Sequence, residues 1–175
     1  MPVLNFEFKA RCANIDELEI RLQACNPAFI GEDHQVDTYF NVHNGRLKLR
    51  EGNIENALIY YERQNTADAK TSKVLLYQHH PDPALKAILI KTHGIRIIVE
   101  KWRKIYFIDN VKFHFDSVPG LGTFVEVEAI DRTGEIGIDK LKVDCEKYAA
   151  LFNIQPSDYI STSYSDMIKM PASWY

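Results

Sequence analysis

The sequence lacks several features that would place it in a specialised class of protein. It has only three cysteines, Cys12, Cys25 and Cys145, and their spacing does not match a metal-binding motif. An odd number of widely spaced cysteines predicts free thiols in a reducing compartment. The beginning of the chain shows no apolar signal core, and no apolar run approaches the length of a membrane span. We therefore expect a cytoplasmic protein with no membrane partner.

An excess of positive charge is also missing. The 21 lysines and arginines are outnumbered by 24 acidic residues, which gives a formal net charge of −3. This balance argues against a protein that binds nucleic acid along its whole surface. The hydrophobic share of 46% and the charged share of 26% are ordinary for a globular protein. No repeat, linker or low-complexity segment divides the 175 residues, so we expect one domain over residues 1–175.

What the sequence does contain is a regular alternation of apolar and charged residues, which predicts strands. The expected strands cover Leu4–Arg11, Ala57–Arg63, Lys73–Gln78, Ile95–Ile108 (as one strand or two), Val111–Ser117 and the stretch that ends at Glu128. A further hairpin is expected around His43-Asn44-Gly45. Three amphipathic helices are expected, one capped by Asn14, one opening at Asp82 and Pro83, and one over residues 138–152. This pattern is typical of an α+β fold dominated by antiparallel hairpins.

The charged faces of these strands are mostly basic. They carry nine basic and four acidic residues, which leaves 12 basic and 20 acidic residues elsewhere in the chain. The basic ones are Lys9, Arg11, Arg46, Lys48, Arg50, Arg63, Lys101, Arg103 and Lys112, and the acidic ones are Glu7, Asp116, Glu126 and Glu128. A protein that is acidic overall has thus gathered cations on one set of strand faces.

Two interpretations of these faces are open. Each face taken alone is explained by simple exposure to water, as on many antiparallel sheets. Taken together, the opposite faces are strongly apolar, and three amphipathic helices are available to cover them. If the helices pack outside, the charged faces turn toward one another, and a sheet of this many strands tends to curl and close. We therefore expect a closed antiparallel β-barrel with a charged interior and with helices packed outside.

A basic interior needs an anion to compensate it. Several cations brought together away from water repel one another, and a polyphosphate supplies both charge and many acceptor oxygens. Arginine side chains match phosphate geometry particularly well. Glu126 and Glu128 alternate onto one face of their strand, and paired carboxylates are the hard ligands that Mg²⁺ or Mn²⁺ prefers. The residues alone therefore predict a site for a polyphosphate together with a divalent metal.

Six ordered segments also resemble a known family. They are Asn5–Lys9, the block from Asp37 to Glu51, ALIYYER from Ala57, Val99–Arg103, His114–Asp116 and GLGTFVEVE ending at Glu128. In this order they resemble the CYTH superfamily, the triphosphate tunnel metalloenzymes, and within it the branch of class IV adenylyl cyclase-like and thiamine triphosphatase-like proteins. The resemblance spans nearly the whole chain and implies a closed barrel that forms a tunnel.

The resemblance also implies roles for particular residues. Metal-side carboxylates would be Glu7, Asp116, Glu126 and Glu128. Phosphate oxygens would be bound by Lys9, Arg46, Lys48, Arg50, Arg63, Lys101 and Arg103. The catalytic residues would be Glu7, Lys9, Arg103 and Glu128.

The implied activity is that of a metal-dependent enzyme acting on a nucleotide or another organic triphosphate. Conversion of ATP to cyclic AMP and pyrophosphate is the first expectation, and hydrolysis of thiamine triphosphate or inorganic tripolyphosphate is the alternative. One position departs from the family pattern, because Asn5 stands where the E-x-E-x-K motif has its first glutamate. Asparagine cannot act as a base, so a non-catalytic protein that binds polyphosphate or nucleotide is a third interpretation. A homodimer is compatible with each of the three.

Overall fold

The computed structural model describes residues 4–62 and 73–168. The strands are β1 (Leu4–Arg11), β2 (Ala28–Phe40), β3 (Arg46–Glu51), β4 (Ala57–Glu62), β5 (Lys73–Gln78), β6 (Ile95–Ile108), β7 (Val111–Val118) and β8 (Gly122–Asp131). The helices are α1 (Ile15–Gln23), α2 (Pro83–His93), α3 (Ile138–Leu151), the 3₁₀ turn η1 (Pro156–Asp158) and α4 (Tyr164–Met167). None of these helices is long and apolar enough to cross a membrane.

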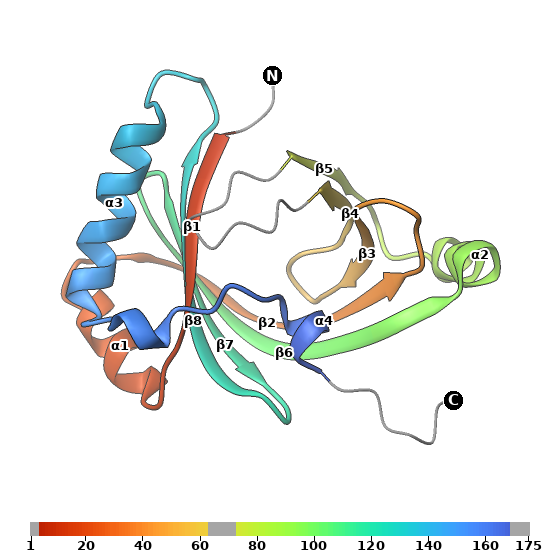
Figure 1. Ribbon diagram of the computed structural model, residues 1–175, viewed down its shortest axis with the longest axis horizontal. Coiled ribbons are helices and arrows are strands. Elements are labelled where there is room, and N and C mark those ends of the chain that lie inside the picture. Colours follow the sequence, from red (N-terminus) through yellow and green to blue (C-terminus); the bar gives the residue numbers. More distant parts are fainter. Residues whose placement is uncertain (1–3, 63–72, 169–175) are drawn as a thin grey trace.

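All eight strands form one antiparallel sheet in the order β1-β8-β7-β6-β2-β3-β4-β5. The sheet is strongly curled, with α1 and α3 outside it at one end and α2 at the other (Figure 1). This confirms the predicted antiparallel architecture with helices packed outside. The predicted closure is less complete, because β1 and β5 are the two edges of the sheet and no pairing joins them in residues 4–62 and 73–168.

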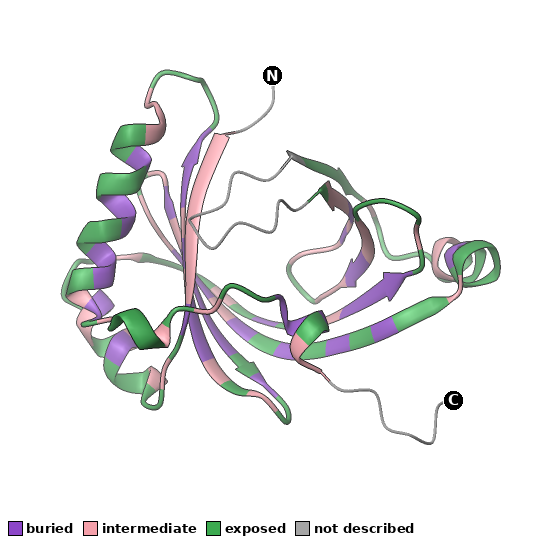
Figure 2. Ribbon diagram, in the orientation of Figure 1, coloured by how far each residue is buried: buried purple, intermediate pink, exposed green. Residues whose placement is uncertain are grey.

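Most of the hydrophobic core lies behind β1, β8 and β7. Outward side chains of β7 and β8, among them Phe113 and Val127, are fully buried in one cluster with Leu141 of α3 and Leu22 of α1, and those of β1 are partly buried against it. Phe113 also makes an edge-to-face contact with Tyr148 on α3, with ring centroids 4.6 Å apart. Burial of this much apolar surface fixes the curvature of this half of the sheet. Figure 2 shows the buried stripe of α3 turned toward the sheet.

The other half of the sheet has much less covering. Its buried outer cluster consists of Phe40, Leu49 and Leu89, the last of which comes from α2. Strand β5 is exposed over residues 74–78, and Leu75 retains 70% of its accessible surface. The two halves are joined by the long strands β2 and β6, which pair over most of their lengths with two register shifts.

The observed elements agree closely with the expectations from alternation and capping. Asn14 accepts the predicted hydrogen bond from the Glu17 amide at 3.3 Å, and Pro83 begins α2 after Asp82. Residues 95–108 form one continuous strand rather than two. Three elements were not predicted, namely the first half of β2 from Ala28, the turn η1 and the short helix α4. Their sequences show neither clean alternation nor a helical stripe, because contacts with distant strands set their conformation.

Candidate functional site

The two glutamates of β8 lie on the inner face of the curl, as predicted. In the register of the sheet, Glu126 stands beside Lys9 of β1 and His114 of β7, and Glu128 stands beside Glu7 of β1. The Lys9 ammonium lies 3.1 Å from a Glu126 carboxylate oxygen. The strands thus bring Lys9 and three of the four predicted metal-side carboxylates into adjoining positions.

The environments of the two glutamates are electrically different. Burial would raise the pKa of Glu126, but Lys9, His114 and Arg103 hold it well below its ordinary value. Glu128 stands beside Lys112 in the register of β7 and accepts a hydrogen bond from the neutral Asn5 amide at 2.9 Å. Burial and the charge of Glu126 nevertheless outweigh Lys112 and Arg103 and raise the pKa of Glu128. An added cation would therefore stabilise the charged form of Glu128.

Arg103 and Asp116 form a buried two-point ion pair beside these glutamates. The Arg103 Nε and Nη2 atoms donate to the two Asp116 oxygens at 2.7 and 2.6 Å. Although burial opposes it, Arg103 lowers the pKa of Asp116 to about 2. Arg103 Nη2 also lies 3.7 Å from Glu126. The prediction that Asp116 binds metal stays a prediction, but its oxygens are already engaged by Arg103.

A second buried carboxylate, Asp37 of β2, gathers three of the predicted phosphate-binding residues. It accepts hydrogen bonds from Arg50 at 2.8 and 2.9 Å, from Lys48 at 3.0 Å and from Lys101 at 2.9 Å. Burial lowers the pKa of Lys101 well below its usual range, and the Asp37 charge opposes that shift. The charge count made from sequence left Asp37 out. It could have been included, because Asp37 alternates with Tyr39 on the face that meets the basic strand β3.

Glu55 was missed for a different reason. It lies in the connection between β3 and β4, where no alternation marks a face. Its carboxylate accepts from Lys112 at 2.5 Å and from Arg50 at 3.1 Å. Although burial opposes it, Lys112 and Arg50 lower the pKa of Glu55. Arg11, by contrast, donates to the Leu121 carbonyl on an exposed part of the surface. The inner face is therefore less basic than the sequence count indicated, because Asp37 and Glu55 belong to it and Arg11 does not.

Arg46 is held by the C-terminal turn formed by residues 163–166. Its Nη1 atom donates to the Ser163 hydroxyl at 2.5 Å and to the Ser165 hydroxyl at 3.2 Å, and its Nη2 atom donates to Asp166 at 2.8 Å. No sequence pattern connects this turn with the basic strands. Arg63, the remaining predicted phosphate-binding residue, lies outside the described residues.

The residues on this face fit a divalent cation of the Mg²⁺ or Mn²⁺ type. Glu126 and Glu128 offer carboxylate oxygens, and the raised pKa of Glu128 reflects burial and the nearby charge of Glu126. In the described part of the chain, no three acidic, histidine or cysteine side chains converge as a complete metal centre. Mg²⁺ is commonly held by one or two carboxylates, with water and substrate phosphates completing its shell. The donor set therefore suits a metal that arrives with a phosphate ligand.

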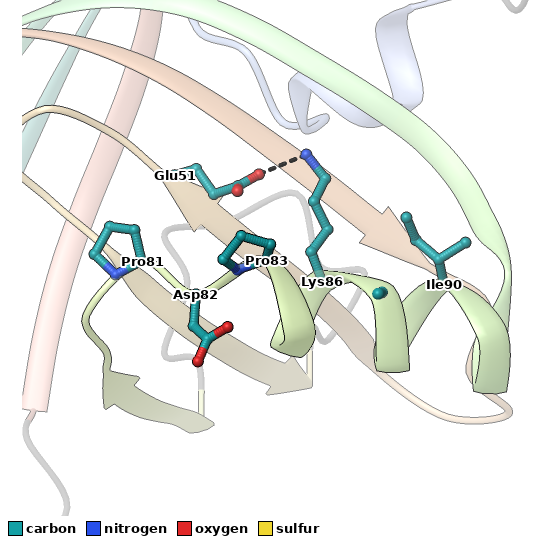
Figure 3. A pocket seen from close by; sticks show the side chains of 7 residues that line it. Glu51, Pro81, Asp82, Pro83, Lys86 and Ile90 are labelled. Carbon is teal, nitrogen blue, oxygen red and sulfur yellow. Dashed lines mark hydrogen bonds and ion pairs between the residues drawn. The ribbon is translucent and has the colours of Figure 1, made fainter.

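A pocket of about 520 Å³ lies away from this face, against α2 (Figure 3). Its lining includes Pro81, Pro83 and Ile90. Two charged lining residues, Glu51 and Lys86, form an ion pair in which Lys86 Nζ donates to a Glu51 oxygen at 2.7 Å. An apolar lining with a satisfied ion pair offers little to a polyanion. The candidate site is therefore the inner face of the curl and not this pocket.

Comparison with known proteins gives three results. A family model described as CYTH domain matches residues 4–151. No curated protein matches the chain. Several solved structures have the same fold. The PH1012 protein of Pyrococcus horikoshii OT3 is 22% identical, with a TM-score of 0.78 over 94% of this chain and 99% of that one.

Two further structures carry activity words in their descriptions. One is a "putative adenylate cyclase" from Vibrio parahaemolyticus, 18% identical, with a TM-score of 0.74 over 95% of this chain and 98% of that one. The other is a "putative adenylyl cyclase" from Hippeastrum that is said to reveal a dominant triphosphatase activity. It is 13% identical, with a TM-score of 0.65 over 95% of this chain and 94% of that one. At these identities the likeness shows the fold alone.

Proposed function

Because the chain belongs to the CYTH domain family, we propose that it is a divalent-metal-dependent enzyme that cleaves an organic triphosphate on the inner face of its curled sheet. The main observation behind this proposal is the buried cluster of Lys48, Arg50 and Lys101 around the single carboxylate of Asp37. Glu55 pairs with Arg50 and Lys112, so four basic side chains face two carboxylates here, which leaves positive charge in a region shielded from water. A triphosphate would supply the missing negative charge.

The basic residues would bind and orient the phosphates. Lys48, Arg50 and Lys101 come from β3 and β6, and Lys9 and Arg103 lie across the face beside Glu126. A triphosphate lying between these two groups of basic residues would contact one group with each of its ends. Arg103, fixed in plane by Asp116, would present its remaining N–H groups to the charge that develops on the reacting phosphate.

The carboxylates would bind the metal and accept a proton. Glu126 and Glu128 would hold the metal, which when bound neutralises phosphate charge and favours departure of the leaving group. Glu128 would also accept the proton of an attacking hydroxyl, because its carboxylate lies on the inner face beside Glu126. Glu7, adjacent to Glu128 in the register, would complete this acidic group.

Cyclisation of ATP is the reaction we place first. The ribose 3′-oxygen would form a bond to the α-phosphorus, the α–β bridging bond would break, and pyrophosphate would leave. Hydrolysis is the second candidate, in which water attacks the terminal phosphorus and orthophosphate is released. The triphosphatase activity stated for the Hippeastrum neighbour supports considering it. Both reactions use the same basic residues and differ in which phosphorus faces the nucleophile.

The test is a product analysis with three substrates. The purified protein would be incubated with ATP, thiamine triphosphate or tripolyphosphate, each with Mg²⁺, with Mn²⁺ or with EDTA. We expect cyclic AMP and pyrophosphate from ATP in the presence of metal. Orthophosphate without cyclic AMP would assign hydrolysis instead. Binding of all three compounds without turnover under every condition would reject both enzymatic proposals and leave a binding protein.

A further inference from the structure

The C-terminal turn of residues 163–166 touches the candidate site at several points. Besides holding Arg46, it carries Tyr164, whose side chain is only 5% exposed. The segment that leads to it is fixed to β1, because the Ile160 amide donates to the Lys9 carbonyl at 2.8 Å. The turn is therefore anchored to the strand that carries one of the proposed catalytic residues.

The Tyr164 hydroxyl reaches the ion pair of the site. It donates to Asp116 Oδ2 at 2.7 Å, the same oxygen that accepts from Arg103 Nη2. Burial, together with the charges of Asp116 and Glu126, raises the pKa of Tyr164 well above its ordinary value. The hydroxyl is therefore protonated and acts as a permanent donor.

The Tyr164 ring reaches Lys9. The Lys9 ammonium lies 4.0 Å from the ring centroid, and the ring also packs on Phe124 with centroids 4.9 Å apart. A cation over an aromatic face is attracted to it, which limits the positions that the flexible lysine can adopt. One side chain thus contacts Lys9 directly and Arg103 through Asp116.

We propose that Tyr164 is a positioning residue of the triphosphate site, which fixes Arg103 through Asp116 and Lys9 through its ring. The catalytic consequence of this inference rests on the proposed function, but the hold of Tyr164 on Arg103 can be measured without any activity. A two-point pair between arginine and carboxylate fixes the guanidinium only if the carboxylate itself cannot rotate. Tyr164 supplies the third contact that holds Asp116.

The competing explanation is that Tyr164 only fills space, because it belongs to a small buried cluster with Tyr39 and Phe124. Tyr164→Phe separates the two explanations, since it keeps the ring and removes only the hydroxyl. Tyr159→Phe is the matched control. Tyr159 lies on the same segment, is 46% exposed, and packs its ring on Phe8 at the outer face.

The first readout is independent of activity. The Arg103 Nε–H resonance would be assigned in ¹⁵N spectra by its loss in Arg103→Lys, and its exchange with solvent would be measured. We expect Tyr164→Phe to speed this exchange roughly tenfold, the effect of losing one hydrogen bond to a charged group, and Tyr159→Phe to leave it unchanged. Unchanged exchange in Tyr164→Phe, with a melting temperature equal to that of the wild type, would overturn the inference.

The second readout is kinetic. With whichever triphosphate the wild type turns over, Tyr164→Phe should lower kcat roughly tenfold and change KM less, because Arg103 acts mainly on the transition state. An equal loss in Tyr159→Phe, or a Tyr164→Phe enzyme with wild-type kcat, would contradict the positioning role. If the wild type turns over nothing, the proposed function fails, and the exchange measurement still decides the role of Tyr164.

Discussion

The two halves of the curled sheet carry different charges inside and different amounts of core outside. The half made of β1, β8 and β7 presents Glu126 and Glu128 inward and is covered outside by α1 and α3. The half made of β2 to β5 presents Asp37, Lys48 and Arg50 inward, with Lys101 added from β6, and among the described residues its outer buried cluster has three members. The acidic side of the site thus stands on the half with the larger core. The cationic side depends more on its own ion pairs, so the two sides should respond differently to substitution.

Removal of the Asp37 charge should give the largest effect. Asp37→Asn leaves the cations that it pairs with buried together, so we expect the free energy of unfolding to fall by about 4 kcal/mol. Urea unfolding with and without tripolyphosphate would measure this, and the polyanion should restore more stability to the variant than to the wild type. Asp139→Asn, on the exposed surface of α3, is the control. A loss no greater than in this control would show that the cations do not depend on Asp37.

A pair of core truncations tests the difference in packing. Phe113→Ala removes a fully buried ring from the large core, and we expect a loss of about 3 kcal/mol. Leu89→Ala removes the α2 contribution to the small cluster and should cost about 2 kcal/mol, because the site can relax toward solvent. Hydrogen exchange should correspondingly be slower in β7 than in β3. Equal losses and equal protection would remove the distinction between the halves.

Glu128→Gln should separate activity from stability. We expect turnover to fall roughly a hundredfold, because the variant loses both a metal ligand and a base. Its stability should rise at neutral pH, since a buried carboxylate with a raised pKa opposes folding when it is charged. Kinetics and urea unfolding on the same samples, with Glu146→Gln on the outer face of α3 as control, would measure both. Undiminished turnover would remove Glu128 from the site.

The last effect concerns His114 and appears only at acid pH. Burial, with the charge of Arg103, lowers the pKa of this histidine from 6.5 to about 4. The unfolded chain therefore takes up the proton first, and stability is lost as the pH falls through the interval between these values. Between pH 7 and pH 5 the contribution is about 2 kcal/mol. His114→Gln should lose correspondingly less stability than the wild type over this range. Parallel curves of stability against pH for the two proteins would show that the pKa of His114 is the same in the folded and unfolded states.

The structure changes the choice of variants for testing the site. Arg103→Ala would leave Asp116 buried without its partner, so lost activity could reflect lost stability. Substitution of Glu128 lessens this difficulty, because its hydrogen bond is with the neutral amide of Asn5 and not with a buried guanidinium. The same hydrogen bond gives Asn5 a role. Asn5 donates to Glu128, whereas the glutamate that the E-x-E-x-K motif has at this position would repel Glu128.

Alternation of side chains was enough to predict the faces of the strands and the residues gathered on the inner face. It could do so because the period of a strand is two and because the apolar faces are nearly uninterrupted. Residues in irregular segments could not be placed in this way. Glu55 and Tyr164 reach the site from a loop and from the C-terminal turn, where only the three-dimensional arrangement decides which strand they meet.

The pairing of the first strand with the last has a consequence for biosynthesis. Asn5 and Glu128 are 123 positions apart in the chain, yet they share a hydrogen bond. While the chain leaves the ribosome, β1 has no strand to pair with in the described sheet until β8 has emerged, so its pairing waits for the synthesis of every element between them. Contacts of such long sequence separation form slowly. Chaperone dependence should therefore be concentrated at β1, and the acidic half of the site cannot form before β8 is made.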